Sequence, residues 1–477
     1  RLTGEPAGAS HVRAVRDEIL SLRRRPVVPC DDASCAFESS AAMGLHDLWV
    51  VASDASFTSS GASWCGLFRN SFHGALDGGS TVRLLALGRA PCDLSQGPNF
   101  RRIPCAAIRV ANIQNEIALM EMLERLPSVA QFAPIVQMLM RRSDEQTLPP
   151  LLPPGVASRA STAASNHLAQ LAVDRDLNPE QKSVLSDCSS WLSSSTVVGF
   201  APRRSSDASE SVCAAQLVHG AFGAGKSHTL AAAVTMLARA LDDAKDDTTR
   251  ILVAGATNSA VDTVLRGLQR AGYTGFVRVG SMRRIHTDIL PHAVHSATGG
   301  DENATAADAI KEIQTALREA RSRRQRAALM RELENARSDV ASSRRSQVAT
   351  ARVVGVTIAS ASNASLEGQR FRIVVLDEAS QMIEPQSMLP IVRFGAERVL
   401  AAGDPMQLPP ILKVLPPASD HNGGLSRTLF SRLAKIGAVP TLLACTYRCH
   451  PALLRVPNVL FYGRRLRCGA AADDRSA

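Results

Sequence analysis

The residues with the clearest chemistry form the run Gly220-Ala221-Phe222-Gly223-Ala224-Gly225-Lys226-Ser227. This run matches the phosphate-binding loop pattern G-x-x-x-x-G-K-[ST] at every fixed position. Glycines let backbone N–H groups turn toward phosphates, and the N-terminus of a following helix adds positive potential there. In such a loop we expect Lys226 to reach the outer phosphates and Ser227 to hold Mg²⁺. A chance glycine-rich turn is the alternative, and the match at all fixed positions argues against it.

Two adjacent acids, Asp377 and Glu378, follow the apolar run Phe371 to Leu376. A lone Asp-Glu pair carries little information, but a strand that delivers two acids downstream of a phosphate loop is the other half of a nucleotide site. We expect Asp377 to join the Mg²⁺ shell and Glu378 to orient and deprotonate the attacking water.

The elements that must position these residues alternate between apolar runs and helical patterns. Ala214 to His219 reads as a buried strand ahead of the loop, and leucine and valine then recur at helical spacing from Leu230 to Leu241. Further apolar runs begin at Ile251, Ala351 and Val399. The alternation from Ala214 to Pro410 predicts an α/β fold, a RecA-like P-loop NTPase domain with a parallel sheet and helices on both faces.

Polar residues at two other places are candidates for binding. Thr257 and Asn258 follow the run from Ile251, where they could bond a nucleic-acid backbone or simply cap the next helix. Gln181 lies in the first turn of a helix that Asn178 should cap, and its amide has the donor and the acceptor that an adenine edge requires. Taken alone, Gln181 would be read as a surface residue.

Composition sets broader limits. The chain has 477 residues, a formal net charge of +10 and 10 cysteines without the spacing of a zinc module. Positive charge suits a polyanionic partner but is weak evidence by itself. The apolar stretches are interrupted by proline, glutamine or charge, so we expect no membrane segment and no signal peptide. The first residue is Arg1, which is compatible with a fragment of a longer protein.

The pattern along the chain predicts five regions. These are a basic, disordered lead-in (1–43), a β-rich accessory domain with a helix (44–148), a linker and helix (149–176), a RecA-like domain with a helical insertion at about 301–350 (177–424), and the start of a second, incomplete RecA-like domain (425–477). The prolines after Pro149 and the Ser/Ala-rich run that follows favour a linker. Ser189 to Ser211 is interpreted as a flexible insertion. Trp49, Trp64 and Phe68 could stack on bases, although core packing is the preferred interpretation.

Together the motifs resemble the superfamily 1 helicases of the nonsense-transcript-regulator (Upf-like) type over about Leu177 to Arg467. The matching stretches are Leu177 to Gln181, Gly220 to Ser227, Thr257 to Asp262, Asp377 to Gln381, Gly403 to Pro409 and Tyr447 to Pro451. Asp47 to Val51, Arg278 to Ser281 and Phe461-Tyr462 look most like the DNA-repair helicases that carry a GRF-type zinc finger.

The resemblance implies an ATP hydrolase coupled to nucleic-acid unwinding, moving 5′ to 3′ on single strands, with ATP and Mg²⁺ as cofactors. It favours DNA repair or recombination in the nucleus, with the cytoplasm as the alternative, and no membrane partner. It also implies residue roles: Gln181 reads adenine and Tyr447 stacks on it, Gln407 senses the γ-phosphate, Arg448 neutralises transition-state charge, and Thr257, Asn258 and Thr357 contact the nucleic-acid backbone. The β-rich segment would be an accessory barrel and the 301–350 helices its stalk.

Two departures from the family pattern matter. Thr446 stands where the family usually has Gln, and the chain ends at Ala477 before the later motifs and any GRF-type zinc finger. We therefore expect a partial chain that binds nucleotide but turns it over weakly. An RNA helicase of the nonsense-mediated decay type and a pseudo-helicase scaffold remain alternatives, although Glu378 argues against the scaffold. A metabolite kinase is disfavoured by Gly403 to Pro409 and Tyr447 to Pro451.

Overall fold

The computed structural model describes residues 20–23, 47–52, 63–68, 81–87, 106–129, 135–136, 139, 147–194, 197–198, 213–294, 302–320, 322–412 and 424–469. The chain forms two compact units, the first made of residues 1–118 and 313–330 and the second of residues 119–312 and 331–477. None of the helices in these described ranges combines the length and the apolar character needed to cross a membrane.

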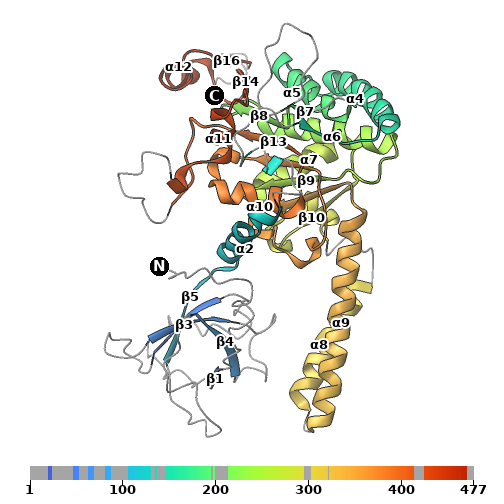
Figure 1. The fold of residues 1–477 in the computed structure, drawn as a ribbon, viewed down its shortest axis with the longest axis vertical. Coiled ribbons are helices and arrows are strands. Elements are labelled where there is room, and N and C mark those ends of the chain that lie inside the picture. The colour runs from blue at the N-terminus through green and yellow to red at the C-terminus, as the bar shows by residue number, and fades with distance from the viewer. Residues whose placement is uncertain are drawn as a thin grey trace. The chain divides into compact units, whose positions relative to one another are not determined.

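A seven-stranded sheet in the order β10-β11-β9-β12-β13-β8-β14 is the core of the second unit, and every neighbouring pair in it is parallel. The predicted α/β fold is therefore confirmed (Figure 1). Most of these strands are buried apolar runs, as expected when helices cover both faces of a parallel sheet. The strands are β8 Ala215–Gly220, β9 Ile251–Gly255, β10 Phe276–Val279, β11 Val353–Thr357, β12 Ile373–Asp377, β13 Arg398–Gly403 and β14 Thr441–Leu443.

Helices connect these strands and pack on the sheet or on one another. The central helix is α6, whose side chains from Thr229 to Ala238 are all buried. It lies against α4, α5 and α7 as well as against β8, β12 and β13. The helices of this unit include α4 Pro154–Asp174, α5 Pro179–Ser189, α6 Lys226–Asp243, α7 Asn258–Arg270, α10 Glu384–Phe394, α11 Leu429–Lys435 and α12 Pro451–Leu460.

The Ser/Ala-rich run that suggested a linker is part of helix α4. Its small residues Ala157, Ala160 and Ala164 are buried, together with Leu171. A surface of alanines lets α4 lie closely along α6, so the run serves packing and not flexibility. The prediction for residues 149–176 named both a linker and a helix, and the structure shows the helix over 154–174.

The strand near Thr441 also differs from the prediction. It was expected to begin a second domain, but β14 pairs with β8 at the edge of the main sheet, in the register Thr441↔Val218. The preceding helix α11 belongs to the same unit, because Arg427 and Arg432 both form ion pairs with Glu384 of α10. Only the segment after Leu443 can therefore start another domain. It holds a small parallel pair, β15 Cys445–Thr446 with β16 Arg467–Cys468, and the helix α12.

The first unit contains a five-stranded antiparallel sheet in the order β1-β4-β3-β2-β5. Its strands are β1 Leu20–Arg23, β2 Asp47–Ala52, β3 Ser63–Phe68, β4 Thr81–Leu87 and β5 Ala106–Asn112. The predicted short strands from Asp47 onward are thus present. Leu20–Arg23 falls in the segment expected to be disordered, yet it pairs with β4, and the rest of that lead-in lies outside the described residues.

Three further elements complete the described chain. The predicted helical insertion is confirmed as a pair, α8 Glu302–Glu319 and α9 Arg323–Thr350. Helix α2 covers Gln114–Val129. Two short strands, β6 Thr147–Leu148 and β7 Val197–Val198, form an antiparallel pair, and the remainder of the predicted 189–211 insertion is largely outside the described residues.

The close approach of α6 and α7 gives a test of the packing. A Cβ added at Gly267 of α7 would lie 2.4 Å from Ala231 Cβ. We expect Gly267→Ala to lower the free energy of unfolding by about 1–3 kcal/mol, because the two helices must separate. Urea unfolding measures this change. Gly155→Ala in α4 is the matched control, since nothing lies within 4 Å of its added Cβ. Equal stability of the two variants would contradict the predicted contact.

Candidate nucleotide-binding site

The phosphate loop connects β8 to α6 and has a backbone that depends on glycine. Gly223 and Gly225 have φ values of 71° and 82°, in the left-handed region, and Gly225 caps the start of α6. A Cβ at Gly220 would lie 2.7 Å from Lys226 Cγ, and one at Gly225 would lie 2.8 Å from Gln181 Nε2. The loop is thus a tight turn closed by α6, the arrangement that suits phosphate groups at a helix N-terminus.

Lys226 lies between this loop and the acids that follow β12. Its side chain is 9% exposed, and its Nζ donates a hydrogen bond to the Gly220 carbonyl at 3.1 Å. The same Nζ is 3.9 Å from Glu378 Oε1. Two motifs that are far apart in the sequence therefore meet at one ammonium group.

Ser227 and Asp377 form the second link between the same two motifs. Ser227 Oγ donates to Asp377 Oδ2 at 2.7 Å, across 150 positions of sequence. Burial raises the pKa of Asp377 to about 6, with a smaller rise from Glu378, while the hydrogen bond from Ser227 and the charge of Lys226 act in the opposite direction. A hydroxyl beside a carboxylate is an oxygen donor set that fits Mg²⁺. An added cation would remove the cost of burying the Asp377 charge.

Glu378 has an unusual backbone. Its φ and ψ are 54° and 39°, a left-handed conformation that residues other than glycine seldom adopt. Its side chain is partly exposed, and Gln381 Nε2 donates to its Oε2 at 3.3 Å. Such a conformation costs energy and is found most often at functional sites. In this conformation Glu378 Oε1 lies 3.9 Å from Lys226 Nζ.

Gln181 reaches the loop from helix α5. Its backbone N–H donates to Asn178 Oδ1 at 2.9 Å, and its own Oε1 accepts from the Asn178 N–H at 3.1 Å, so the two residues form a capping box. Gln181 is only 3% exposed, so it is not the surface residue that its sequence context alone suggested. Its Nε2 faces Gly225.

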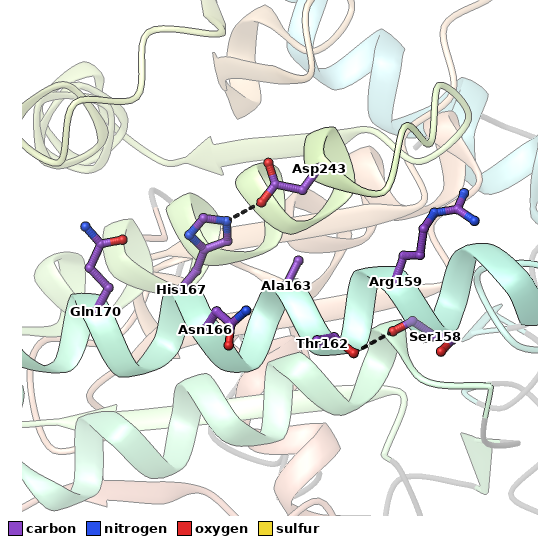
Figure 2. Close-up of a pocket in the computed structure, with 8 residues that line it drawn as sticks. All are labelled: Ser158, Arg159, Thr162, Ala163, Asn166, His167, Gln170 and Asp243. Atoms are coloured by element: carbon purple, nitrogen blue, oxygen red, sulfur yellow. Dashed lines mark hydrogen bonds and ion pairs between the residues drawn. The ribbon is translucent and has the colours of Figure 1, made fainter.

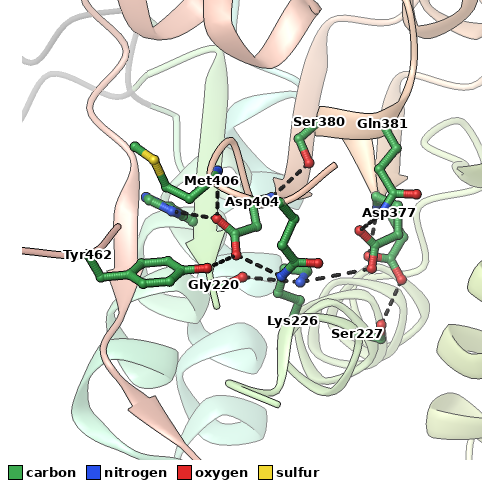
Figure 3. A network of polar contacts seen from close by, with 12 residues as sticks. Gly220, Lys226, Ser227, Asp377, Ser380, Gln381, Asp404, Met406 and Tyr462 are labelled. Atoms are coloured by element: carbon green, nitrogen blue, oxygen red, sulfur yellow. Dashed lines mark hydrogen bonds and ion pairs between the residues drawn. The ribbon is translucent and has the colours of Figure 1, made fainter. Parts of the chain in front are cut away.

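The loop after β13 is centred on Asp404. Gln407 Nε2 donates to Asp404 Oδ2 at 2.7 Å. The Asp404 backbone N–H donates to Ser380 Oγ at 2.8 Å, and Ser380 follows the two acids after β12. Asp404 thus links Gln407 to the segment that carries the two acids, and Figure 3 shows its bond to Ser380.

Residues 446–448 lie directly against the phosphate loop. Thr446 Oγ1 donates to the Phe222 carbonyl at 2.6 Å, and the Tyr447 N–H donates to the Gly223 carbonyl at 3.0 Å. A Cβ at Gly223 would lie 2.3 Å from Arg448 Cβ. Tyr447 is 41% exposed, and its hydroxyl accepts a long, 3.5 Å hydrogen bond from Asn178. Gln181 and Tyr447 therefore both lie beside the loop.

Thr257, Asn258 and Thr357 occupy the same edge of the sheet. Thr257 follows β9, is exposed and caps α7 by accepting from the Ala260 N–H at 3.2 Å. Thr357 ends the neighbouring strand β11 and is 6% exposed. Asn258 Oδ1 accepts from the fully buried Arg278 at 2.8 Å. The cap that sequence reasoning left as an alternative for this motif is thus present.

Residues 195–414 match the family described as the AAA domain. The chain is 39% identical over 266 residues to the 5′-3′ DNA helicase ZGRF1 of Mus musculus, covering 54% of this chain and 14% of that protein. It is 32% identical over 260 residues to the DNA polymerase alpha-associated DNA helicase A of Schizosaccharomyces pombe, covering 52% and 37%. It is 31% identical over 265 residues to the ATP-dependent helicase upf1 of the same yeast, covering 55% and 27%.

Over about half of its length, the chain is similar to Upf1-like helicases of superfamily 1. The resemblance drawn from the sequence motifs is thereby confirmed. The chain spans less than half the length of each of these relatives.

Sequence reasoning missed four polar residues next to the nucleotide-binding motifs. His219 and Tyr462 both bond to Asp404, at 3.1 Å and 2.6 Å, and Ser380 bonds to its backbone. Asp404 and Ser380 stand inside recognised motifs, so their position was a usable signal. For His219 and Tyr462 no sequence spacing indicates the contact.

A surface pocket lies elsewhere, between α4 and the end of α6 (Figure 2). His167 Nε2 and Asp243 Oδ2 pair across it at 2.7 Å. It contains none of the predicted site residues. Its lining consists of Ser158, Arg159, Thr162, Ala163, Asn166, His167, Gln170 and Asp243.

The buried charge of Asp377 predicts a pH-dependent gain of stability on substitution. The folded-state pKa of about 6 lies above the ordinary value of 3.8, so ionisation costs stability as the pH rises through this window. This free-energy cost is fully present at a pH above the folded-state pKa and absent at a pH below the unfolded-state pKa. It amounts to about 3 kcal/mol. We therefore expect Asp377→Asn to raise the Tm in EDTA more at pH 7 than at pH 5, measured by scanning fluorimetry.

The exposed Asp247→Asn is the control for this comparison. An equal gain in Tm at both pH values for Asp377→Asn would mean that the carboxylate carries no such penalty.

Proposed function

We propose that this chain is the motor core of an ATP-dependent helicase or translocase that acts on single-stranded nucleic acid. The observation that carries the proposal is the meeting of Lys226 and Ser227 with Asp377 and Glu378 at one edge of a parallel sheet. Ligand sites of such sheets lie at the carboxyl ends of the strands. A phosphate loop and a pair of acids at that edge are the parts needed to bind and hydrolyse a nucleoside triphosphate.

The proposed roles follow from the contacts. Lys226 leaves the Gly220 carbonyl and binds the outer phosphates, while Ser227 and Asp377 hold Mg²⁺, which supplies positive charge to the phosphate oxygens. Glu378 accepts a proton from the attacking water. Gln181 and Tyr447 bind the adenine from the two sides of the loop, a role that their positions beside Gly225 and Gly223 support.

We assign Gln407 and Arg448 to the coupling of hydrolysis with movement. Gln407 senses the γ-phosphate, which its connection to the acids through Asp404 and Ser380 supports. Arg448 stabilises transition-state charge, and its contact with Gly223 supports that role. The segment 445–469 is then the first part of a second RecA-like domain. The antiparallel sheet of the first unit serves as an accessory domain and α8–α9 as its stalk.

Thr257, Asn258 and Thr357 are the proposed contacts to the nucleic-acid backbone. Thr357 ends β11, and Thr257 follows the end of the neighbouring strand β9, which supports a strand of nucleic acid crossing that edge. DNA is the preferred substrate, with 5′ to 3′ movement and a role in repair in the nucleus, by analogy with the relative named as a 5′-3′ DNA helicase. RNA as the substrate and the cytoplasm as the location are the alternative, which rests on the resemblance of the motifs to nonsense-transcript-regulator helicases.

A pseudo-helicase scaffold that binds nucleotide without hydrolysis is the second candidate. Glu378 argues against it, because a scaffold needs neither that base nor its costly left-handed backbone.

Replacing the proposed base tests the function directly. We expect Glu378→Gln to lower ATP turnover at least about 100-fold in the presence of single-stranded DNA, because the amide cannot take up a proton. Binding of a fluorescent ATP analogue should change less than about threefold, since Lys226 and Ser227 are intact. The exposed Glu367→Gln serves as the matched control. Equal turnover in the Glu378 variant and the parent would refute the assigned mechanism.

The choice of nucleic acid has its own test. We expect a single-stranded DNA oligonucleotide to stimulate ATP turnover more than RNA of the same sequence at equal ionic strength. Phosphates and stackable bases are common to both, so only contacts at the 2′ position can separate them. Stronger stimulation by RNA would favour the alternative substrate.

A further inference from the structure

The carboxylate of Asp404 is completely buried and has four donors. Its Oδ1 accepts from His219 Nε2 and from the Met406 N–H, each at 3.1 Å. Its Oδ2 accepts from Gln407 Nε2 at 2.7 Å and from Tyr462 Oη at 2.6 Å. A carboxylate has about four lone-pair positions, so this group is fully satisfied and has one orientation in which all four bonds form.

Two of these donors come from different parts of the domain. Gln407 belongs to the loop after β13, whereas Tyr462 follows α12 in the segment 445–469. Both donate to the same oxygen, so the position of one donor limits the geometry open to the other. Figure 3 shows the Tyr462 hydroxyl pointing at Asp404. The proposed γ-phosphate sensor thus shares the Asp404 Oδ2 acceptor with a residue of the C-terminal segment.

Tyr462 is held firmly at this place. It is 3% exposed and packs in an apolar cluster with Ala221 of the phosphate loop and with Leu454 and Leu466. Its ring is tilted against that of His219, with centroids 6.3 Å apart. Burial and the bond to Asp404 raise the pKa of Tyr462, which keeps its hydroxyl protonated as a donor.

We propose that Tyr462 is a positioning residue that couples the segment 445–469 to Gln407 through the shared carboxylate oxygen of Asp404. The inference rests on the proposed function of Gln407 and assigns Tyr462 to the regulation of the same site. When the segment moves away from the phosphate loop, Asp404 loses a donor and is free to turn, and Gln407 loses its fixed orientation. When the segment docks, Gln407 is held in place again.

Removing one hydroxyl tests this coupling. Tyr462→Phe keeps the ring and its packing, and Tyr273→Phe is the matched control because Tyr273 also donates to an aspartate, Asp242, at 3.1 Å, away from the nucleotide-binding motifs. We expect Tyr462→Phe to lower the kcat for ATP about tenfold with the KM for ATP changed less than about twofold. The control should retain the parent kcat. A kcat equal to that of the control would overturn the proposal.

A double-mutant cycle separates positioning from general damage to the fold. If Tyr462 acts through Gln407, then Tyr462→Phe should change kcat by less than about twofold in a Gln407→Ala background. An unchanged tenfold loss in that background would show that Tyr462 acts by another route.

Hydrogen exchange tests the same coupling without catalysis. In the full chain without nucleotide, Tyr462→Phe should speed exchange about tenfold in both α12 and the Asp404–Leu408 loop, whereas Tyr273→Phe should speed neither. Unchanged exchange in both segments would overturn the proposal. A parent chain that hydrolyses no ATP but shows this exchange pattern would contradict the proposed function alone.

Discussion

The structure depends on one constraint, which is that parallel strands end at the same edge of their sheet. Because β8 and β12 are both parallel strands of this sheet, the loop after one and the acids after the other are brought together. The bond from Ser227 to Asp377 and the approach of Lys226 to Glu378 are the result. Each further motif, at Gln181, Gln407 and Tyr447, reaches this same place from a different connection. The chemistry of the domain is therefore a property of its topology, with each element supplying one or two groups.

Several of these groups are costly to the fold. Asp377 is almost completely buried, and its raised pKa records the penalty on its charge. Glu378 holds a left-handed backbone. Asp404 differs, because hydrogen bonds from His219, Tyr462, Met406 and Gln407 outweigh the effect of burial and lower its pKa. The site thus combines two different carboxylates. The charge of Asp377 is not fully compensated by its neighbours, whereas Asp404 has a donor for each of its acceptor positions. The first suits a cation and the second suits a fixed structural role.

The strand near Thr441 was expected to begin a second domain, but it belongs to the main sheet. Thr441–Leu443 completes the edge of the main sheet through β8, the strand that leads into the phosphate loop. The chain then turns directly onto that loop, where Thr446 and Tyr447 bond to its carbonyls. Thr446, which replaces the usual Gln of the family, contributes its hydroxyl to this contact. A nucleotide-dependent change at the loop would reach the segment 445–469 through these bonds and through the cluster of Ala221 with Tyr462.

The amino-acid sequence alone determined the phosphate loop, the acids after β12, the α/β alternation and the helical pair at 302–350. Each of these is a local pattern of residue types at short spacing, set by backbone conformation and by periodic burial. The sequence did not reveal that the alanines of α4 pack on α6, that β14 joins the seven-stranded sheet, or that Tyr462 and His219 meet at Asp404. A strand carries no mark of which neighbour it will pair with, and a tyrosine carries no mark of its acceptor. Those choices were decided by tertiary structure, because they depend on which distant surfaces bury the most apolar area and satisfy the most polar groups.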